Sequence, residues 1–221
     1  MNQSFYVSPQ QLMKDRADFA RQGISRGKPV VLASCAAGIV LVTENSSTSL
    51  RKLSEIYDRI GLGAVGRYNE FEALRQNGVR YADTRGYAYD RADVTARGLV
   101  SHYAGILGEL FLTGAKPLEV EIAVAEVGAS LDDDRLYRVS FDGTVTESTP
   151  VIVIGGGAEQ LQQRLSSEWD SQRPLDDAIT AIQSAWTDAT GEMAWETAVL
   201  DRDRAAVGGR SFRRRTRHGR H

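Results

Sequence analysis

Between residues 8 and 26 the apolar positions recur with the 3.6-residue period of an amphipathic helix. Ser8 is suited to cap this helix, and Pro9 to occupy its first position, where a missing N–H costs nothing. Gln11 follows Ser8 by three residues, so the two side chains are spaced for a capping box. The apolar side of the helix, which needs cover, consists of Leu12, Met13, Ala17, Phe19, Ala20 and Ile24. Two glycines offer places at which the helix can end, Gly23 and Gly27.

Short apolar runs bounded by turn residues predict strands in the rest of the chain. Asp142-Gly143 predicts a tight hairpin turn between two of them. Residues 119–124 alternate between branched apolar side chains and Glu or Ala, which predicts a strand with one wet face. The expected strands are residues 30–35, 38–42, a pair within 56–65, 119–124, 136–141, 144–146, 151–154 and 195–200.

Helical spacing returns in two pairs of segments, each pair following a group of strands. The expected helices are residues 67–85, 94–111, 158–169 and 175–190. Consecutive hairpins indicate antiparallel sheets, and a helix pair on each side indicates four layers. We therefore predict an α/β (α+β) fold, a four-layer αββα sandwich of antiparallel sheets with an extra N-terminal helix.

Composition is that of a soluble globular protein. Of the 221 residues, 42% are hydrophobic and 25% are charged, and the net charge of −2 argues against general nucleic-acid binding. No apolar run approaches the length of a membrane span, and the N-terminal residues lack the pattern of a signal peptide. A single cysteine excludes an internal disulfide. These features predict a cytoplasmic protein.

Few residues offer catalytic or ligand chemistry. Cys35 lies in an apolar strand, where a small buried core residue is the better interpretation. Ser101 and His102 are adjacent on a helix and so do not face each other. Residues 155–157 are three glycines between a strand and a helix, but no Lys-Ser/Thr pair follows them as in a phosphate loop. We expect neither a metal nor a cofactor.

The C-terminal residues 206–221 form an arginine-rich tail that we expect to be disordered. Such a tail binds polyanions at low salt, so a nucleic-acid-binding protein is one alternative. The favoured interpretation is a solvated tail, because only Phe212 is available to stack on a base.

The wording SPQQLMKDRADFARQGISRG at residues 8–27, followed by a hairpin and then by Ser49-Leu50-Arg51-Lys52-Leu53, resembles a proteasome α-subunit of the actinobacterial type. The resemblance continues to about residue 200. It implies the N-terminal-nucleophile hydrolase fold, in a subunit of a seven-membered ring that caps proteasome β-subunits. The implied partners are β-subunits, neighbouring α-subunits, an AAA+ ATPase ring and tagged protein substrates in transit, with no membrane and no specific nucleic acid.

The resemblance also assigns roles to single residues. It implies a gate at the ring axis and a pocket in which a lysine pairs with the terminal carboxylate of an ATPase activator. The pocket position of that lysine is Lys52, which by itself reads as an ordinary solvated lysine. Gly27 and Arg67 match the other pocket positions, although Arg67 replaces a more usual apolar residue. The gate consists of Met1, Asn2, Gln3, Ser4, Phe5, Tyr6, Val7, Ser8 and Pro9, without the Tyr-Asp-Arg motif of archaeal and eukaryotic relatives.

Two functions from different classes follow. The first is a non-catalytic gating subunit, with residues 1–8 as the tail, 9–205 as the domain and 206–221 as the basic extension. The alternative is a self-processed hydrolase of the same fold. Catalytic proteasome subunits expose a threonine at the start of the first strand. That strand begins near Pro29, where no Thr, Ser or Cys stands, so we favour the first function.

Overall fold

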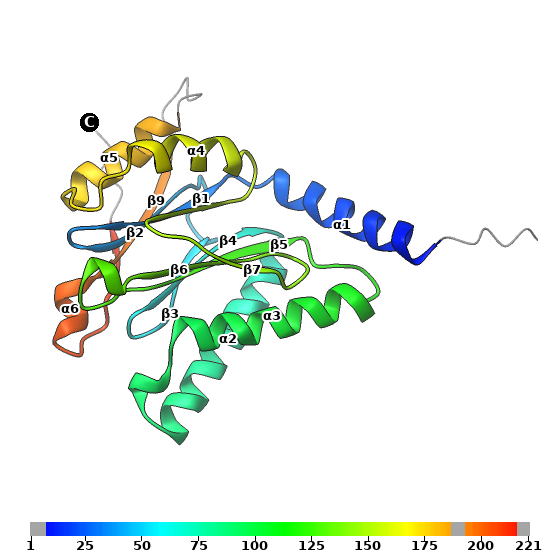
Figure 1. Ribbon diagram of the computed structural model, residues 1–221, viewed down its shortest axis with the longest axis horizontal. Helices are drawn as coiled ribbons and strands as arrows, with labels where there is room; N and C mark the ends of the chain where they lie inside the picture. Colours follow the sequence, from blue (N-terminus) through cyan, green and yellow to red (C-terminus); the bar gives the residue numbers. More distant parts are fainter. Residues whose placement is uncertain (1–7, 187–192, 216–221) are drawn as a thin grey trace, which may run out of the picture.

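The computed structural model describes residues 8–186 and 193–215, which form two five-stranded antiparallel sheets (Figure 1). Sheet A has the strand order β10-β9-β2-β1-β8, and sheet B has the order β3-β4-β5-β6-β7. The strands of sheet A are β1 (Val30–Cys35), β2 (Gly38–Glu44), β8 (Val151–Ile154), β9 (Trp195–Asp201) and β10 (Phe212–Arg215). Those of sheet B are β3 (Leu53–Tyr57), β4 (Ile60–Gly66), β5 (Val120–Glu126), β6 (Arg135–Val139) and β7 (Val145–Glu147).

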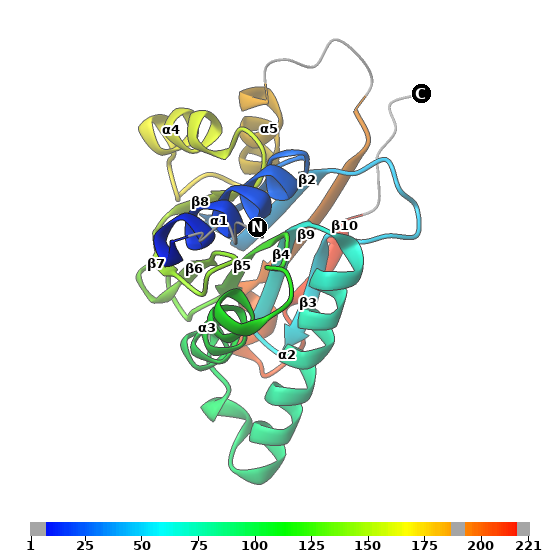
Figure 2. The ribbon, with the colours of Figure 1, turned by 90° about the vertical axis from the view of Figure 1, so that its right-hand side faces the viewer.

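Helices cover the outer face of each sheet. The two long helices pack on sheet B, and two shorter ones pack on sheet A (Figures 1 and 2). Three apolar cores separate the four layers, and the one between the sheets contains Leu32, Leu41 and Ala123. The predicted αββα sandwich is therefore confirmed. The helices are α1 (Pro9–Ser25), α2 (Tyr68–Ala88), α3 (Ala96–Thr113), α4 (Ala158–Glu168), α5 (Leu175–Ala185) and α6 (Arg202–Ala206), with 3-10 turns at Arg91–Asp93 and Leu131–Asp133.

The predicted start of α1 is confirmed, but its capping box is not. The Ser8 hydroxyl accepts a hydrogen bond from the Gln11 amide at 3.2 Å. The Gln11 side chain turns forward to Asp15 at 2.6 Å instead of back to the cap, because an acceptor one turn ahead is within its reach. The helix runs through Gly23 and ends at Ser25, before Gly27.

Helix α1 lies across one end of the sandwich, with only its second half inside (Figure 1). Ala20 and Ile24 are buried in the core between the sheets, whereas Leu12 and Phe19 remain 48% and 43% exposed. Arg16, which sits within the apolar stripe, donates to the carbonyl oxygens of Leu110, Phe111 and Gly114 at 2.8–3.3 Å. These carbonyls end α3, so the guanidinium meets the negative end of a helix dipole in its own chain.

The prediction of one wet face for residues 119–124 is wrong. Glu119 and Glu121 are 6% and 4% exposed, because the face that they share with Ala123 packs toward the other sheet. The Glu121 carboxylate is neutralised by Arg138 at 2.5 Å and accepts a hydrogen bond from the Gly155 amide at 2.9 Å. A strand buried on both faces can thus carry acidic side chains if each finds a partner.

The basic segment after residue 206 is also more ordered than predicted. Phe212–Arg215 forms strand β10, whose register pairs Phe212 with Leu200 and Arg215 with Thr197. Its arginines are held by Asp201, Glu196 and Asp176, acidic residues that the local sequence does not reveal. Expectations for residues 216–221, and for the end of the helix predicted to residue 190, fall outside the described residues.

Two glycines in the helices that cover sheet B have opposite surroundings. A Cβ at the buried Gly78 would lie 1.9 Å from the hydroxyl oxygen of Tyr103, a fully buried side chain. A Cβ at the exposed Gly105 would meet nothing within 4 Å. Gly78 is therefore required by packing, whereas Gly105 only weakens its helix.

We predict that Gly105→Ala raises the free energy of unfolding of the isolated chain by about 0.5–1 kcal/mol, since alanine loses less backbone entropy in a helix. Gly78→Ala should lower it by about 1–3 kcal/mol through overpacking. Urea unfolding followed by circular dichroism measures both. Equal effects of the two substitutions would contradict this reading of the packing.

Candidate functional site

Lys52, Gly27 and Arg67 lie at one end of the hairpin formed by β3 and β4. Lys52 directly precedes β3, and its carbonyl accepts a hydrogen bond from the Ala64 amide of β4 at 3.0 Å. Arg67 follows β4 and occupies the N-cap position of α2, without a capping hydrogen bond from its side chain. The Lys52 ammonium donates to the Lys28 carbonyl at 3.1 Å, which places it beside Gly27. The fold therefore gathers three residues that the sequence spreads over forty positions.

Gly27 is needed because the backbone packs closely on its neighbours. A Cβ there would lie 2.3 Å from Cγ1 of Val65 in β4. The Gly27 carbonyl accepts a hydrogen bond from Gly156 at 3.0 Å, so the link from α1 to β1 is tied to the turn between β8 and α4. The three glycines at 155–157 form that turn, with positive φ at Gly155 and Gly157, as predicted in place of a phosphate loop.

Arg67 is anchored rather than free. Its Nε lies 2.7 Å from the buried Glu119 carboxylate, and its amide donates to the Glu119 carbonyl at 3.0 Å. Glu70, buried in the first turn of α2, pairs with Lys116 at 2.5 Å and accepts the Glu119 amide at 2.7 Å. Arg67 and Lys116 are thus the two exposed cations that neutralise a buried pair of glutamates, a role that explains a charged residue at position 67.

The electrostatics at Lys52 favour an anionic ligand. Burial lowers the pKa of its half-buried ammonium below the ordinary lysine value. The negative charges of Glu196 and Glu44 partly offset this lowering, and the positive charge of Lys28 adds to it. Among residues 8–186 and 193–215, the Lys28 carbonyl is the one hydrogen-bond acceptor of Nζ. An ammonium with unused donors gains most from a carboxylate that approaches it.

Glu196 positions the Lys52 segment and was missed by sequence reasoning. This carboxylate, 4% exposed on β9, accepts hydrogen bonds from the backbone amides of Lys52 and Leu53 at 3.0 and 3.2 Å. Asn45 and Arg214 donate to it from two other segments at 2.7 and 2.9 Å. The available signal was a glutamate within an apolar strand, but the sequence does not indicate its partners.

The start of β1 carries none of the usual nucleophiles. Residues 27–30 read Gly-Lys-Pro-Val, and the buried Cys35 at the far end of the strand has a thiol whose pKa burial raises. Ser101 donates to the Arg97 carbonyl at 3.0 Å, whereas His102 contacts Asn77 at 2.7 Å, so the two form no catalytic pair. Within the described segments there is no metal-binding cluster, and no helix is long and apolar enough to cross a membrane.

Of the predicted gate, the structure places two residues. Ser8 and Pro9 cap and begin α1 at the end that projects from the sandwich (Figure 1). Met1, Asn2, Gln3, Ser4, Phe5, Tyr6 and Val7 lie outside the described residues.

Comparison with known proteins decides the family. A model described as proteasome subunit matches residues 24–198, which include strands from both sheets and the pocket residues. The chain belongs to the proteasome subunit family. Its sandwich is accordingly the N-terminal-nucleophile hydrolase-like architecture, with α1 as the additional N-terminal helix.

Relatives within this proteasome family are α-subunits from actinobacteria. The chain is 55% identical to the proteasome subunit alpha of Arthrobacter sp. (strain FB24) and 53% identical to that of Paenarthrobacter aurescens, covering 97% of this chain and 94% of each relative. It is 50% identical to the proteasome subunit alpha of Jonesia denitrificans, with 98% and 94% covered. The resemblance noted in the sequence is therefore confirmed over nearly the full chain.

We predict that Glu196→Ala lowers the free energy of unfolding by about 3 kcal/mol, because Arg214 and two backbone amides lose a buried acceptor. The residues before β3 should also become more sensitive to limited proteolysis. Urea unfolding and mass mapping of the cleavage sites measure these effects.

Glu159→Ala is the matched control, since Glu159 is exposed and forms no ion pair with another described residue. It should change stability by less than about 0.5 kcal/mol. If Glu196→Ala is as stable as Glu159→Ala, Glu196 does not position the Lys52 segment.

Proposed function

We propose that this chain is a non-catalytic subunit of a proteasome α-ring, which gates entry to a chamber of β-subunits and docks an ATPase activator. The observation that carries the proposal is the position of the Lys52 ammonium. It donates to the Lys28 carbonyl, next to Gly27, and has no other acceptor among the described residues. The family assignment supports the ring, and the relatives' name of α-subunit supports the place in it.

We also propose that the chain has no peptidase activity of its own, because no nucleophile stands at the start of β1. A self-processing subunit needs a hydroxyl or thiol nucleophile at this strand end, freed by cleavage. Cleavage before Pro29 would expose no such nucleophile and would remove α1, whose Ala20 and Ile24 belong to the central core. No observation favours the hydrolase alternative.

Docking of an activator is proposed through a C-terminal carboxylate at Lys52. The ammonium is partly desolvated and fixed by the Lys28 carbonyl, so it needs little reorganisation to receive an anion. The partners of this subunit are then β-subunits, neighbouring α-subunits, an AAA+ ATPase ring and the tagged proteins that it feeds into the pore.

Native mass spectrometry of the assembly purified from its own cells tests the proposal as a whole. We expect a large particle that contains this chain with its N-terminal segment intact, and equal amounts of a second, processed subunit. A small species trimmed near Pro29 would overturn the proposal in favour of the hydrolase.

We predict that Lys52→Ala leaves the ring assembled and weakens binding of a peptide with a free C-terminal carboxylate by about 10- to 100-fold, through loss of a charge-assisted hydrogen bond. Wild-type affinity should fall as the pH rises through the lowered pKa of Lys52, since only the protonated amine attracts the carboxylate. Fluorescence anisotropy measured from neutral pH up to the ordinary pKa of lysine, about 10.4, follows this change, because the shift is downward.

Lys52→Arg is the matched variant, because a guanidinium stays protonated throughout this range. Its affinity should be independent of pH, and a peptide with an amidated C-terminus should bind neither protein well. Equal binding of the amidated and free peptides would exclude a carboxylate pocket at Lys52.

We predict that deletion of Met1–Val7 speeds hydrolysis of short peptides by the assembled particle, since it removes the chain segments that obstruct the pore. Hydrolysis of a fluorogenic peptide measures entry when no activator is present. Native mass spectrometry must show the same particle for both proteins. An unaltered rate would show that these residues form no barrier.

A further inference from the structure

A basic cleft of about 650 Å³ opens on the flank of the sandwich where β3 and β10 form the sheet edges. We call it the arginine cleft. It is framed by these two edge strands and by the start of α2, on the flank seen at the right of Figure 2. Its lining consists of Arg51, Ser54, Glu55, Tyr68, Glu72, Arg75, Arg204, Arg210, Phe212, Arg213 and Arg214.

Positive charge dominates the arginine cleft. Six arginines and two glutamates line it, and Asp201 and Glu196 each pair with a further arginine, which leaves an excess of two positive charges. Four of the arginines are paired, with Glu72, Glu55, Asp201 and Glu196. Arg51 and Arg204 are both exposed, and neither forms an ion pair with another residue in 8–186 or 193–215. The two unpaired arginines therefore leave the cleft with positive charge that can attract an acidic partner.

The opposite flank presents an acidic residue at a matching position. Sheet B runs from β3 to β7, and its registers form a continuous row across all five strands. That row is Ser54, Leu62, Val124, Tyr137 and Glu147. Ser54 lines the arginine cleft, and Glu147 lies at the other end of the same row, on β7.

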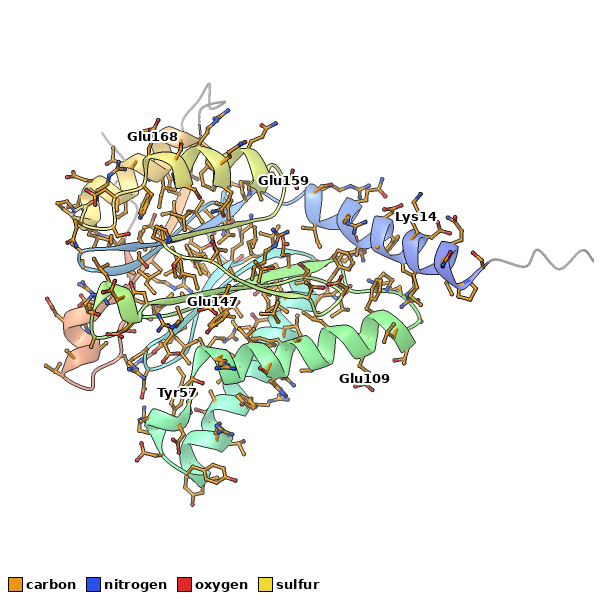
Figure 3. The ribbon with its side chains drawn as sticks, in the orientation of Figure 1. Lys14, Tyr57, Glu109, Glu147, Glu159 and Glu168 are labelled. Carbon is orange, nitrogen blue, oxygen red and sulfur yellow. The ribbon has the colours of Figure 1, made fainter. Side chains whose placement is uncertain are left out.

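Glu147 is available to a partner. All three residues of β7 are exposed, and Val145 beside it is a large apolar side chain with 42% exposure. Glu147 forms no ion pair with another described residue, and Figure 3 labels it in the middle of the view, near β7. The β7 edge thus presents both an unpaired carboxylate, Glu147, and an exposed apolar side chain, Val145.

We propose that the arginine cleft receives the β7 edge of a second copy of this chain, with Glu147 entering among Arg51 and Arg204. A closed ring uses two different faces of each subunit. In the proposed ring the axis runs across the layers, so the same layers of neighbouring copies lie level with each other. The β7 end of the row in one copy can then face the β3 end in the next. This inference rests on the proposed α-ring.

Charge reversal and its rescue test the pairing in particles that also contain the β-subunits. Glu147→Arg, and separately the double variant Arg51→Glu and Arg204→Glu, should each lower the assembled fraction at fixed protein concentration by about tenfold. All three substitutions together should restore most of it. Native mass spectrometry counts the copies in each particle, and wild-type assembly should weaken with added salt.

Glu168→Arg is the matched control, an exposed acid at the end of α4 that lies outside the row and forms no ion pair with a described residue. It should assemble like the wild type. Failure of the triple variant to recover, or normal assembly of Glu147→Arg, would overturn the pairing even where rings form. Loss confined to the cleft variants would overturn it in favour of an acidic segment on a β-subunit. A wild-type chain found as a monomer would instead refute the α-ring itself.

Discussion

The central strands of both sheets are covered on both faces, so a charged side chain that enters one of these strands must be neutralised inside the protein. Glu121 meets this requirement through Arg138 and the Gly155 amide. Glu196 meets it with four donors from three other segments. Because these carboxylates are buried, their hydrogen bonds fix the segments that they contact. Burial makes these carboxylates costly unless they are neutralised, and for the same reason it makes them hold their partner segments in place.

The end of the sandwich that α1 closes shows how this positioning serves the site. A Cβ at Gly23 would lie 2.2 Å from the Glu119 carboxylate, so the helix packs directly over the cluster that anchors Arg67. Four residues later, Gly27 passes Val65 with equal closeness. Lys52 then reaches the Lys28 carbonyl from the next hairpin. Helix α1 and the three candidate pocket residues therefore form one packed unit, and a shift of either would move the other.

The sequence predicts the layers well because apolar periodicity reports directly on burial. It predicts Lys52, Gly27 and Arg67 only through family resemblance, since none of them is distinctive by composition. Glu196 and Arg214 could not be found, because their pairing depends on which strands become neighbours in sheet A. Strand β10 was mistaken for a tail for the same reason: an arginine-rich strand has no apolar alternation, and its stabilising acids are distant in sequence.

Arginines on β10 also solve a problem that every sheet edge poses. An edge strand with unpaired backbone groups can pair with any other strand, and charged side chains discourage such pairing. In this chain the effect depends on the charge of the approaching edge. Arg213 and Arg214 line a cleft with excess positive charge, which repels another basic edge and attracts an acidic one. The strand orders put β10 and β3 on one flank and β7 and β8 on the other, so the proposed pairing joins two unlike edges. That asymmetry is what a head-to-tail ring requires of its subunit.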